Sequence, residues 1–160
     1  MQAILVPIDG SKPCDAALRH VVREVRLGQV AHIHLVNEQP HLGAYVGRFV
    51  GTPAIRAFQR ELGEKALARA KQLLDEAGVP YSTHIYVGEA AAVIATAAKT
   101  LGVGEIVMSA RGFGIPGGMA VNSLIGGVIR RTDVPVSVIK GASELDFENN
   151  AGQWKLRPTH

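Results

Sequence analysis

The stretch that decides the fold is EIVMSARGFGIPGGMAVNSLIGGVIRRTDVPVSVIK, residues 105–140. Its first four residues form a short apolar run bounded by turn residues, which predicts a buried strand. The segment SARGFGIPGG (109–118) has glycines at positions 112, 114, 117 and 118 and predicts a loop. Asn122 and Ser123 suit a helix N-cap, so we expect a helix from there to Arg131. The alternating VPVSVIK (134–140) predicts a second strand.

This order of strand, glycine loop and helix start is suited to one side of a phosphate site. A helix N-terminus offers unpaired N–H groups and a positive dipole, and glycines let the backbone come close to an anion. A surface turn rarely needs four glycines, so the loop from Gly112 to Gly118 favours such a site.

The rest of the chain alternates strand and helix patterns. Near-continuous apolar runs predict strands that are covered on both faces, and the runs between them have helical spacing. The expected strands are 2–8, 30–37 and 81–87, and the expected helices are 13–28, 52–77 and 89–101. Together with residues 105–140 this is the β-α-β-α-β-α-β-α-β order of a doubly wound α/β parallel sheet.

Two features of the middle of the chain are expected from the same patterns. The loop from 38 to 51 exceeds the usual length in a compact domain, and such loops tend to be lids, binding segments or linkers. The helix that follows carries an apolar stripe that we expect to face the core, namely Ile55, Phe58, Leu62, Ala66, Leu73 and Leu74.

Composition limits the class of protein. A length of 160 residues, 47% hydrophobic and 19% charged, predicts one globular domain. The net charge is +3 and the longest basic run is Arg130-Arg131, which excludes a basic patch for nucleic acid. No apolar run approaches the ~20 residues of a membrane span, and no signal peptide is recognisable at the N-terminus. A single cysteine excludes an internal disulfide and fits a cytoplasmic protein.

The segment 105–140 resembles the universal stress protein family, whose ATP-binding members carry G-x2-G-x9-G-[S/T] after the fourth strand. That spacing falls on Ser109, Gly112, Asn122 and Ser123, so two motif glycines are replaced. The resemblance continues in MQAILVPIDGS at the start, in VGEAA (87–91) and in DVPVSVIK, and it covers residues 1–140. We therefore expect a universal stress protein domain over 1–140 and a C-terminal tail over 141–160.

The resemblance implies a three-layer, five-stranded parallel sheet of order 3-2-1-4-5, the adenine nucleotide alpha-hydrolase-like fold. In such sheets ligands bind beyond the carboxyl ends of the strands that flank the switch point. Here these are the first and fourth strands, so we expect Asp9 and Ser109 to lie together.

The resemblance also implies a set of nucleotide-binding residues. Asp9 corresponds to an aspartate that contacts the nucleotide, and Pro7 and Ile8 would line the adenine pocket with Val36 and Met108 as apolar walls. Phosphates would be held by Ser109, Gly112, Asn122, Ser123 and Leu124. The expected ligand is ATP, with Mg²⁺, or ADP or AMP, and the smaller nucleotides suit the crowded motif better.

Each of these residues also has a purely structural explanation. Asp9 could form an Asx-turn, Ser123 could be a simple N-cap, and Val36 and Met108 could be core residues. A side chain at position 109 or 122 costs about 1–3 kcal/mol if φ is positive or if phosphate needs the space. Asparagine is the least penalised substitute at positive φ, and its amide could donate to an oxyanion. Some family members without the complete motif do not bind ATP.

Other chemistries find little support. GFGIPG (112–117) matches GxGxxG but follows the fourth strand rather than the first, and neither a P-loop nor a GxSxG motif is present. His32 and His34 lie on one strand face without a recognisable third metal ligand, and Cys14 is best explained as a small buried residue. No base or metal site for hydrolysis can be named, so ATP hydrolysis is expected to be slow or absent.

The family pairs subunits through its last strand, here 134–140, so the resemblance implies a homodimer. An apolar edge strand gives that pairing a physical motive, because it would otherwise invite aggregation. The first functional hypothesis is a regulatory protein of the stress response that binds an adenine nucleotide. The alternatives are a dimeric interaction module whose nucleotide crevice is vestigial and, with least support, a slow nucleotide hydrolase.

Overall fold

The computed structural model describes residues 2–43, 51–110 and 119–141 of the chain, and the side chains of 119–122 are not among the described parts. Its strands form one five-stranded sheet, in which every pair is parallel and the order is β3-β2-β1-β4-β5. The expected sheet order is therefore confirmed. The elements in chain order are β1 (Gln2–Pro7), a 3₁₀ turn (Lys12–Cys14), α1 (Asp15–Arg26), β2 (Val30–Gln39), α3 (Thr52–Ala77), β3 (Tyr81–Val87), α4 (Ala90–Leu101), β4 (Glu105–Ser109), α5 (Met119–Arg131) and β5 (Val136–Ile139).

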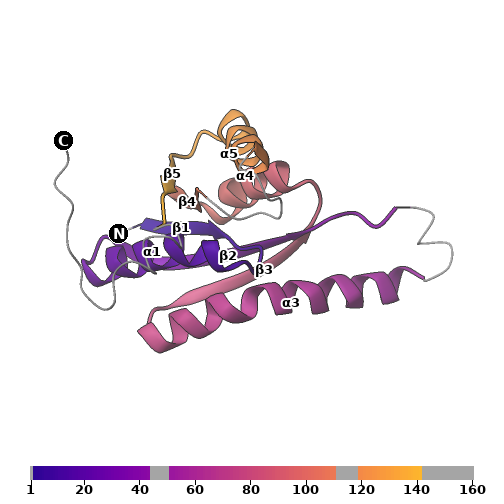
Figure 1. The fold of residues 1–160 in the computed structure, drawn as a ribbon, viewed down its shortest axis with the longest axis horizontal. Coiled ribbons are helices and arrows are strands. Elements are labelled where there is room, and N and C mark those ends of the chain that lie inside the picture. Colours follow the sequence, from indigo (N-terminus) through magenta and orange to yellow (C-terminus); the bar gives the residue numbers. More distant parts are fainter. Residues whose placement is uncertain (1, 44–50, 111–118, 142–160) are drawn as a thin grey trace, which may run out of the picture.

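The molecule has three layers, with the sheet between two pairs of helices (Figure 1). Alternate residues of β1 point to opposite faces, so Ile4 and Val6 pack in the cluster beneath α1 and α3. Leu5 joins Ile94 of α4 and Val128 of α5 in the second cluster. Because both faces of the sheet are covered, the central strand β1 is a near-continuous apolar run. Among the described residues, no helix is long and apolar enough to cross a membrane.

Two helices end at glycines and one begins at a capping carboxylate. Gly78 and Gly102 follow α3 and α4 with φ of 66° and 63°, the left-handed conformation that glycine adopts without steric cost. At the start of α4, Glu89 accepts hydrogen bonds from the backbone N–H groups of Ala91 (3.1 Å) and Ala92 (3.0 Å). These local signals explain why the predicted bounds of both helices are close to those observed.

The predicted apolar stripe of α3 is confirmed at Leu74, but earlier in the helix the buried positions lie one residue after the predicted ones. The residues that face the sheet are Gln59, Gly63, Leu67, Ala70 and Leu74, whereas Phe58 and Leu62 are 50% and 38% exposed. The reason is close packing: a Cβ atom on Gly63 would lie only 2.7 Å from the side chain of Ile85 in β3. Small residues let this face approach the sheet, and apolar periodicity alone does not detect that.

The bounds of three other elements also differ from the sequence expectation. Strand β2 continues two residues further, to Gln39, and β5 is limited to Val136–Ile139. Helix α5 begins at Met119, so the prediction that Asn122 and Ser123 form its N-cap is wrong. Ala120 is a strong helix former, and no helix breaker stands between it and Ser123.

Candidate functional site

The carboxyl ends of β1, β2 and β4 lie side by side at one edge of the sheet. Pro7 of β1 is opposite Val36 of β2, and on its other side β1 pairs with β4 at Ile4–Glu105 and Leu5–Ile106. The backbone N–H of Ile8 continues the ladder by donating to the carbonyl oxygen of Val36 at 2.8 Å. Parallel strand order therefore brings the residues that follow β1 next to those that end β4, as expected.

Asp9 organises the turn that leaves β1. Its Oδ1 accepts hydrogen bonds from the backbone N–H of Ser11 (2.8 Å), the hydroxyl of Ser11 (2.6 Å) and the thiol of Cys14 (3.0 Å). The first of these is the Asx-turn that was the structural explanation for this residue. Burial, with the charge of Asp9 second, raises the pKa of Cys14 to about 12, so the thiol stays protonated. A contact between Asp9 and a nucleotide stays a prediction.

The hydroxyl of Ser109 is turned toward α1. It accepts a hydrogen bond of 3.1 Å from the backbone N–H of Ala17, in the first turn of that helix, and Ser109 is only 3% exposed. A helix start has N–H groups without partners inside the helix, and Ser109 satisfies one of them. The side chain of Ser109 is thereby engaged within the protein on the α1 face of the sheet.

The predicted apolar walls, Val36 and Met108, are fully buried in the cluster on the α4 and α5 side of the sheet. Leu124 packs against the same cluster, and Ser123 is exposed in the second turn of α5. Because only the first four N–H groups of a helix lack a partner, the N–H of Ser123 falls within the helical ladder. Gly112 and the side chain of Asn122 lie outside the described residues.

The end of β2 contributes two buried amides that sequence reasoning missed. Asn37 donates to the carbonyl oxygen of Ile8 at 2.8 Å, and Gln39 donates to Oδ1 of Asn37 at the same distance. Both residues are more than nine-tenths buried. The available signal was the run Asn-Glu-Gln (37–39), which ends β2. The sequence expectation ended this strand at Asn37 and so left out the last two residues.

Glu38 lies between these amides in sequence but on the opposite face of β2. Its Oε2 atom is buried and has no hydrogen-bond partner among the described residues. Burial raises the pKa of Glu38, and the nearby charge of Asp9 adds to this, while the backbone amide of Glu38 itself acts in the opposite direction. An unpartnered buried carboxyl oxygen is costly in a folded protein and calls for an explanation.

Three histidines gather on the same face of the β2–β3 pair. Nδ1 of His34 and Nε2 of His84 are 3.1 Å apart, and the ring of His32 meets that of His34 edge-on with centroids 4.8 Å apart. Burial, followed by the charge of His32, lowers the pKa of both His34 and His84. His84 joins the pair through strand register, which spacing along β2 could not reveal. Even so, no group of three metal-ligating side chains in the described ranges is arranged to hold an ion.

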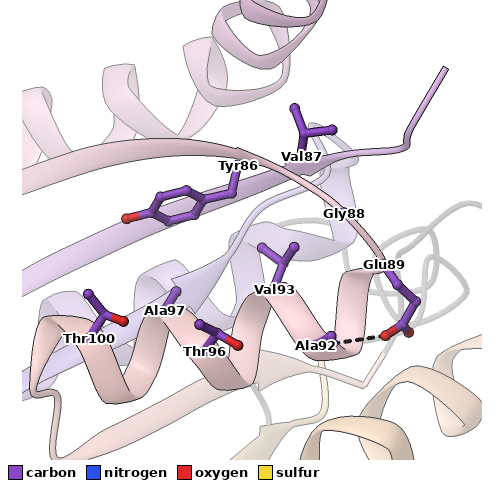
Figure 2. A pocket seen from close by; sticks show the side chains of 9 residues that line it. All are labelled: Tyr86, Val87, Gly88, Glu89, Ala92, Val93, Thr96, Ala97 and Thr100. Carbon is purple, nitrogen blue, oxygen red and sulfur yellow. Dashed lines mark hydrogen bonds between the residues drawn. The ribbon is translucent and has the colours of Figure 1, made fainter.

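A groove of about 370 Å³ lies between the end of β3 and α4. Figure 2 shows Tyr86 reaching over the helix toward the side that carries Val93, Thr96 and Thr100. The residues that line the groove are Tyr86, Val87, Gly88, Glu89, Ala92, Val93, Thr96, Ala97 and Thr100. None of the predicted nucleotide-binding residues is among them. This groove is therefore separate from the strand ends that carry Asp9 and Val36.

Similarity to known proteins agrees with this architecture. Residues 1–140 match the model of the universal stress protein family. The fold is similar to that of the hypothetical protein MJ0577, with a TM-score of 0.69 and 23% identity over 89% of this chain and 98% of that one. No curated protein sequence matches the chain.

Two further structures of similar fold contain an adenine nucleotide. One is the universal stress protein from Archaeoglobus fulgidus in complex with dAMP, at 20% identity and a TM-score of 0.64, covering 88% of this chain and 98% of that one. The other is a universal stress protein in complex with cAMP, at 16% identity and a TM-score of 0.65, covering 86% and 96%. Since the family match spans all five strands, this chain belongs to the universal stress protein family.

Proposed function

We propose that this chain is a stress-response regulator that binds an adenine nucleotide at the carboxyl ends of β1, β2 and β4. The observation that carries the proposal is the adjacency of the strand ends that lead into Asp9 and into the glycine-rich segment 109–118. The complexes of similar folds with dAMP and cAMP support the same class of ligand.

In this proposal the nucleoside and the phosphates are held by different strand ends. Pro7, Ile8, Asp9, Val36 and Met108 hold the nucleoside, while the phosphates meet Ser109, Gly112, Asn122, Ser123 and Leu124. Because the Ser109 hydroxyl already bonds to Ala17, Ser109 would contribute through its backbone. AMP or ADP suits the site better than ATP, which would bring Mg²⁺ to offset its charge.

The proposal extends to the assembly and the cellular setting of the chain. The domain of residues 1–140 would form a cytoplasmic homodimer through residues 134–140, with 141–160 as a tail outside it. In support, β5 is the outer strand of the sheet and Val138 on it is 44% exposed. An apolar strand at a sheet edge is a ready surface for pairing with a second copy.

A second candidate is a dimeric interaction module that needs no nucleotide. It is favoured by the internal partners of Asp9 and by the complete burial of Val36 and Met108. The two candidates differ in one measurable property, which is the affinity of the protein for adenine nucleotides.

Titration calorimetry with AMP, ADP and ATP, with and without Mg²⁺, separates the candidates. The nucleotide proposal expects saturable binding of at least one of these ligands, weakened in Asp9→Asn. Asp133→Asn is a matched control. Asp133 is exposed and precedes β5, so it lies where the parallel strands begin, away from the carboxyl ends that form the proposed site. Absence of binding heat and of any thermal shift at millimolar nucleotide would leave the interaction module as the function.

A further inference from the structure

We propose that Glu38 is a ligand-contacting residue of the nucleotide crevice, which accepts a hydrogen bond from the nucleoside part of the ligand and so selects that part. This inference rests on the nucleotide site proposed above. It goes further by naming a recognition residue and the kind of ligand group that it recognises.

The first support is a buried oxygen atom that has no hydrogen-bond partner in the described part of the chain. Oε2 of Glu38 is shielded from solvent, yet no described group donates to it. Buried carboxylates in native proteins are normally satisfied by hydrogen bonds, because leaving one unsatisfied costs the full desolvation penalty. A hydrogen-bond donor supplied by a ligand would remove that cost.

The second support is the position of Glu38 on its strand. Side chains two residues apart in a strand point to the same face, so Glu38 follows Val36 on the α4 and α5 side. The neighbouring strand end carries Asp9, whose charge acts on the carboxyl of Glu38. Glu38 therefore shares one face of β2 with Val36, the predicted wall of the base, and is near enough to Asp9 for the two carboxyl groups to interact.

The third support comes from the order of the strands. In the strand order β2-β1-β4, Glu38 near the end of β2 lies on one side of the end of β1, and Ser109 at the end of β4 lies on the other. If the phosphates lie toward the end of β4, as proposed above, the nucleoside lies toward β2. Electrostatics agrees, since two neighbouring carboxyl groups repel a phosphate but accept hydrogen bonds from neutral donors.

A nucleoside offers two kinds of donor to a carboxylate. The exocyclic amine of adenine is one, and the ribose hydroxyls are the other. Hypoxanthine has a carbonyl oxygen where adenine has its amine, so it would meet Glu38 with an acceptor facing an acceptor. A 2′-deoxyribose lacks one hydroxyl and leaves the base unchanged. IMP therefore tests the amine and 2′-deoxy-AMP tests the 2′-hydroxyl, whereas recognition of the 3′-hydroxyl would leave both analogues behaving like AMP.

The test compares AMP, IMP and 2′-deoxy-AMP in calorimetric titrations of the wild-type protein, Glu38→Gln and Glu38→Met. A hydrogen bond to a charged group supports a loss of about tenfold or more in AMP affinity in both variants. If the amine is the donor, IMP binds the wild type weakly and is insensitive to the substitutions. If the 2′-hydroxyl is the donor, 2′-deoxy-AMP instead binds the wild type weakly and is insensitive to the substitutions. Glu61→Gln is the control, because Glu61 is exposed on α3.

A second measurement does not depend on added nucleotide. At neutral pH both variants should melt above the wild type, since each removes a carboxylate whose native pKa is raised and whose buried Oε2 atom has no donor among the described residues. This gain in melting temperature should vanish at acid pH, where Glu38 is protonated in both the folded and the unfolded protein. A higher melting temperature also shows that the variants fold.

The outcomes separate this inference from the proposed function. Tight AMP binding that is equal in the wild type and both Glu38 variants overturns the inference and leaves the nucleotide proposal intact. Failure of the wild type to bind any of the three ligands overturns both. Weaker AMP binding in the Glu38 variants, with Glu61→Gln unchanged, supports both.

Discussion

The hydroxyl of Ser109, at the end of β4, accepts a hydrogen bond of 3.1 Å from the backbone N–H of Ala17 in the first turn of α1. Ser109 stands where ATP-binding members of the family have the first glycine of their phosphate motif. Here its side chain accepts a hydrogen bond from the first turn of α1, which lies on the opposite side of the sheet from Met108. The serine at this position therefore stabilises the start of α1.

Replacing Ser109 by glycine should leave nucleotide affinity unchanged and reduce stability. The expected loss is about 1 kcal/mol for the hydrogen bond, with a further ~0.5–1 kcal/mol for glycine in a strand. Urea denaturation measures the change in stability, and calorimetric titration with ATP measures the change in nucleotide affinity. Ser109→Ala separates the hydroxyl from the backbone effect. A clear rise in ATP affinity in Ser109→Gly would instead show that the side chain obstructs phosphate.

Replacing Gly63 by alanine should push α3 away from the sheet. The new Cβ would lie 2.7 Å from Ile85, and overpacking of this kind costs about 1–3 kcal/mol. Gly126→Ala in α5 is the matched control, because its nearest neighbour is the flexible end of Arg130 at 3.3 Å. Thermal denaturation should show a loss only for Gly63→Ala, partly restored by Ile85→Val. Equal effects at both glycines would contradict the packing explanation.

Acidification should weaken the protein through His34 and His84. Their native pKa values are lowered below the ordinary 6.5, chiefly by burial and then by neighbouring histidines, and no carboxylate is among the charges that act on them. Between the lowered pKa and 6.5 the unfolded chain binds more protons, so stability falls as pH falls through this window. In denaturant titrations His84→Gln should flatten this part of the profile.

The thiol of Cys14 should react slowly in the native protein. Its pKa of about 12 leaves almost no thiolate at neutral pH, and its side chain is buried against Asp9. Labelling with a chromogenic disulfide reagent at pH 7.5 should become fast only after denaturation in urea. In Asp9→Asn the native rate should rise, because the negative charge that contributes to the raised pKa is gone. Rapid labelling of the native wild type would show that the turn opens readily.

Much of the fold follows from local patterns in the chain. Apolar and alternating runs predicted the five strands, and the observed helices α3 and α4 end at Gly78 and Gly102 because only glycine adopts their left-handed conformation at no cost. The start of α5 was predicted wrongly, since Asn122 and Ser123 resemble caps whether or not the preceding residues are helical. Cap chemistry is a weaker signal than the propensity of the residues before it.

The sequence by itself determined the order of the elements, the parallel class of sheet and, through the family resemblance, the expectation that the ends of the first and fourth strands meet. These features depend on periodicity and turn chemistry, which are written in neighbouring residues. Only the tertiary structure decided that Ser109 faces α1, that Gly63 rather than Leu62 faces the sheet, and that His84 joins His34. It alone showed that the charge of Asp9 acts on Glu38, whose buried Oε2 atom has no hydrogen-bond partner among the described residues. Such contacts depend on strand register and helix rotation, which are fixed by packing between residues far apart in the chain.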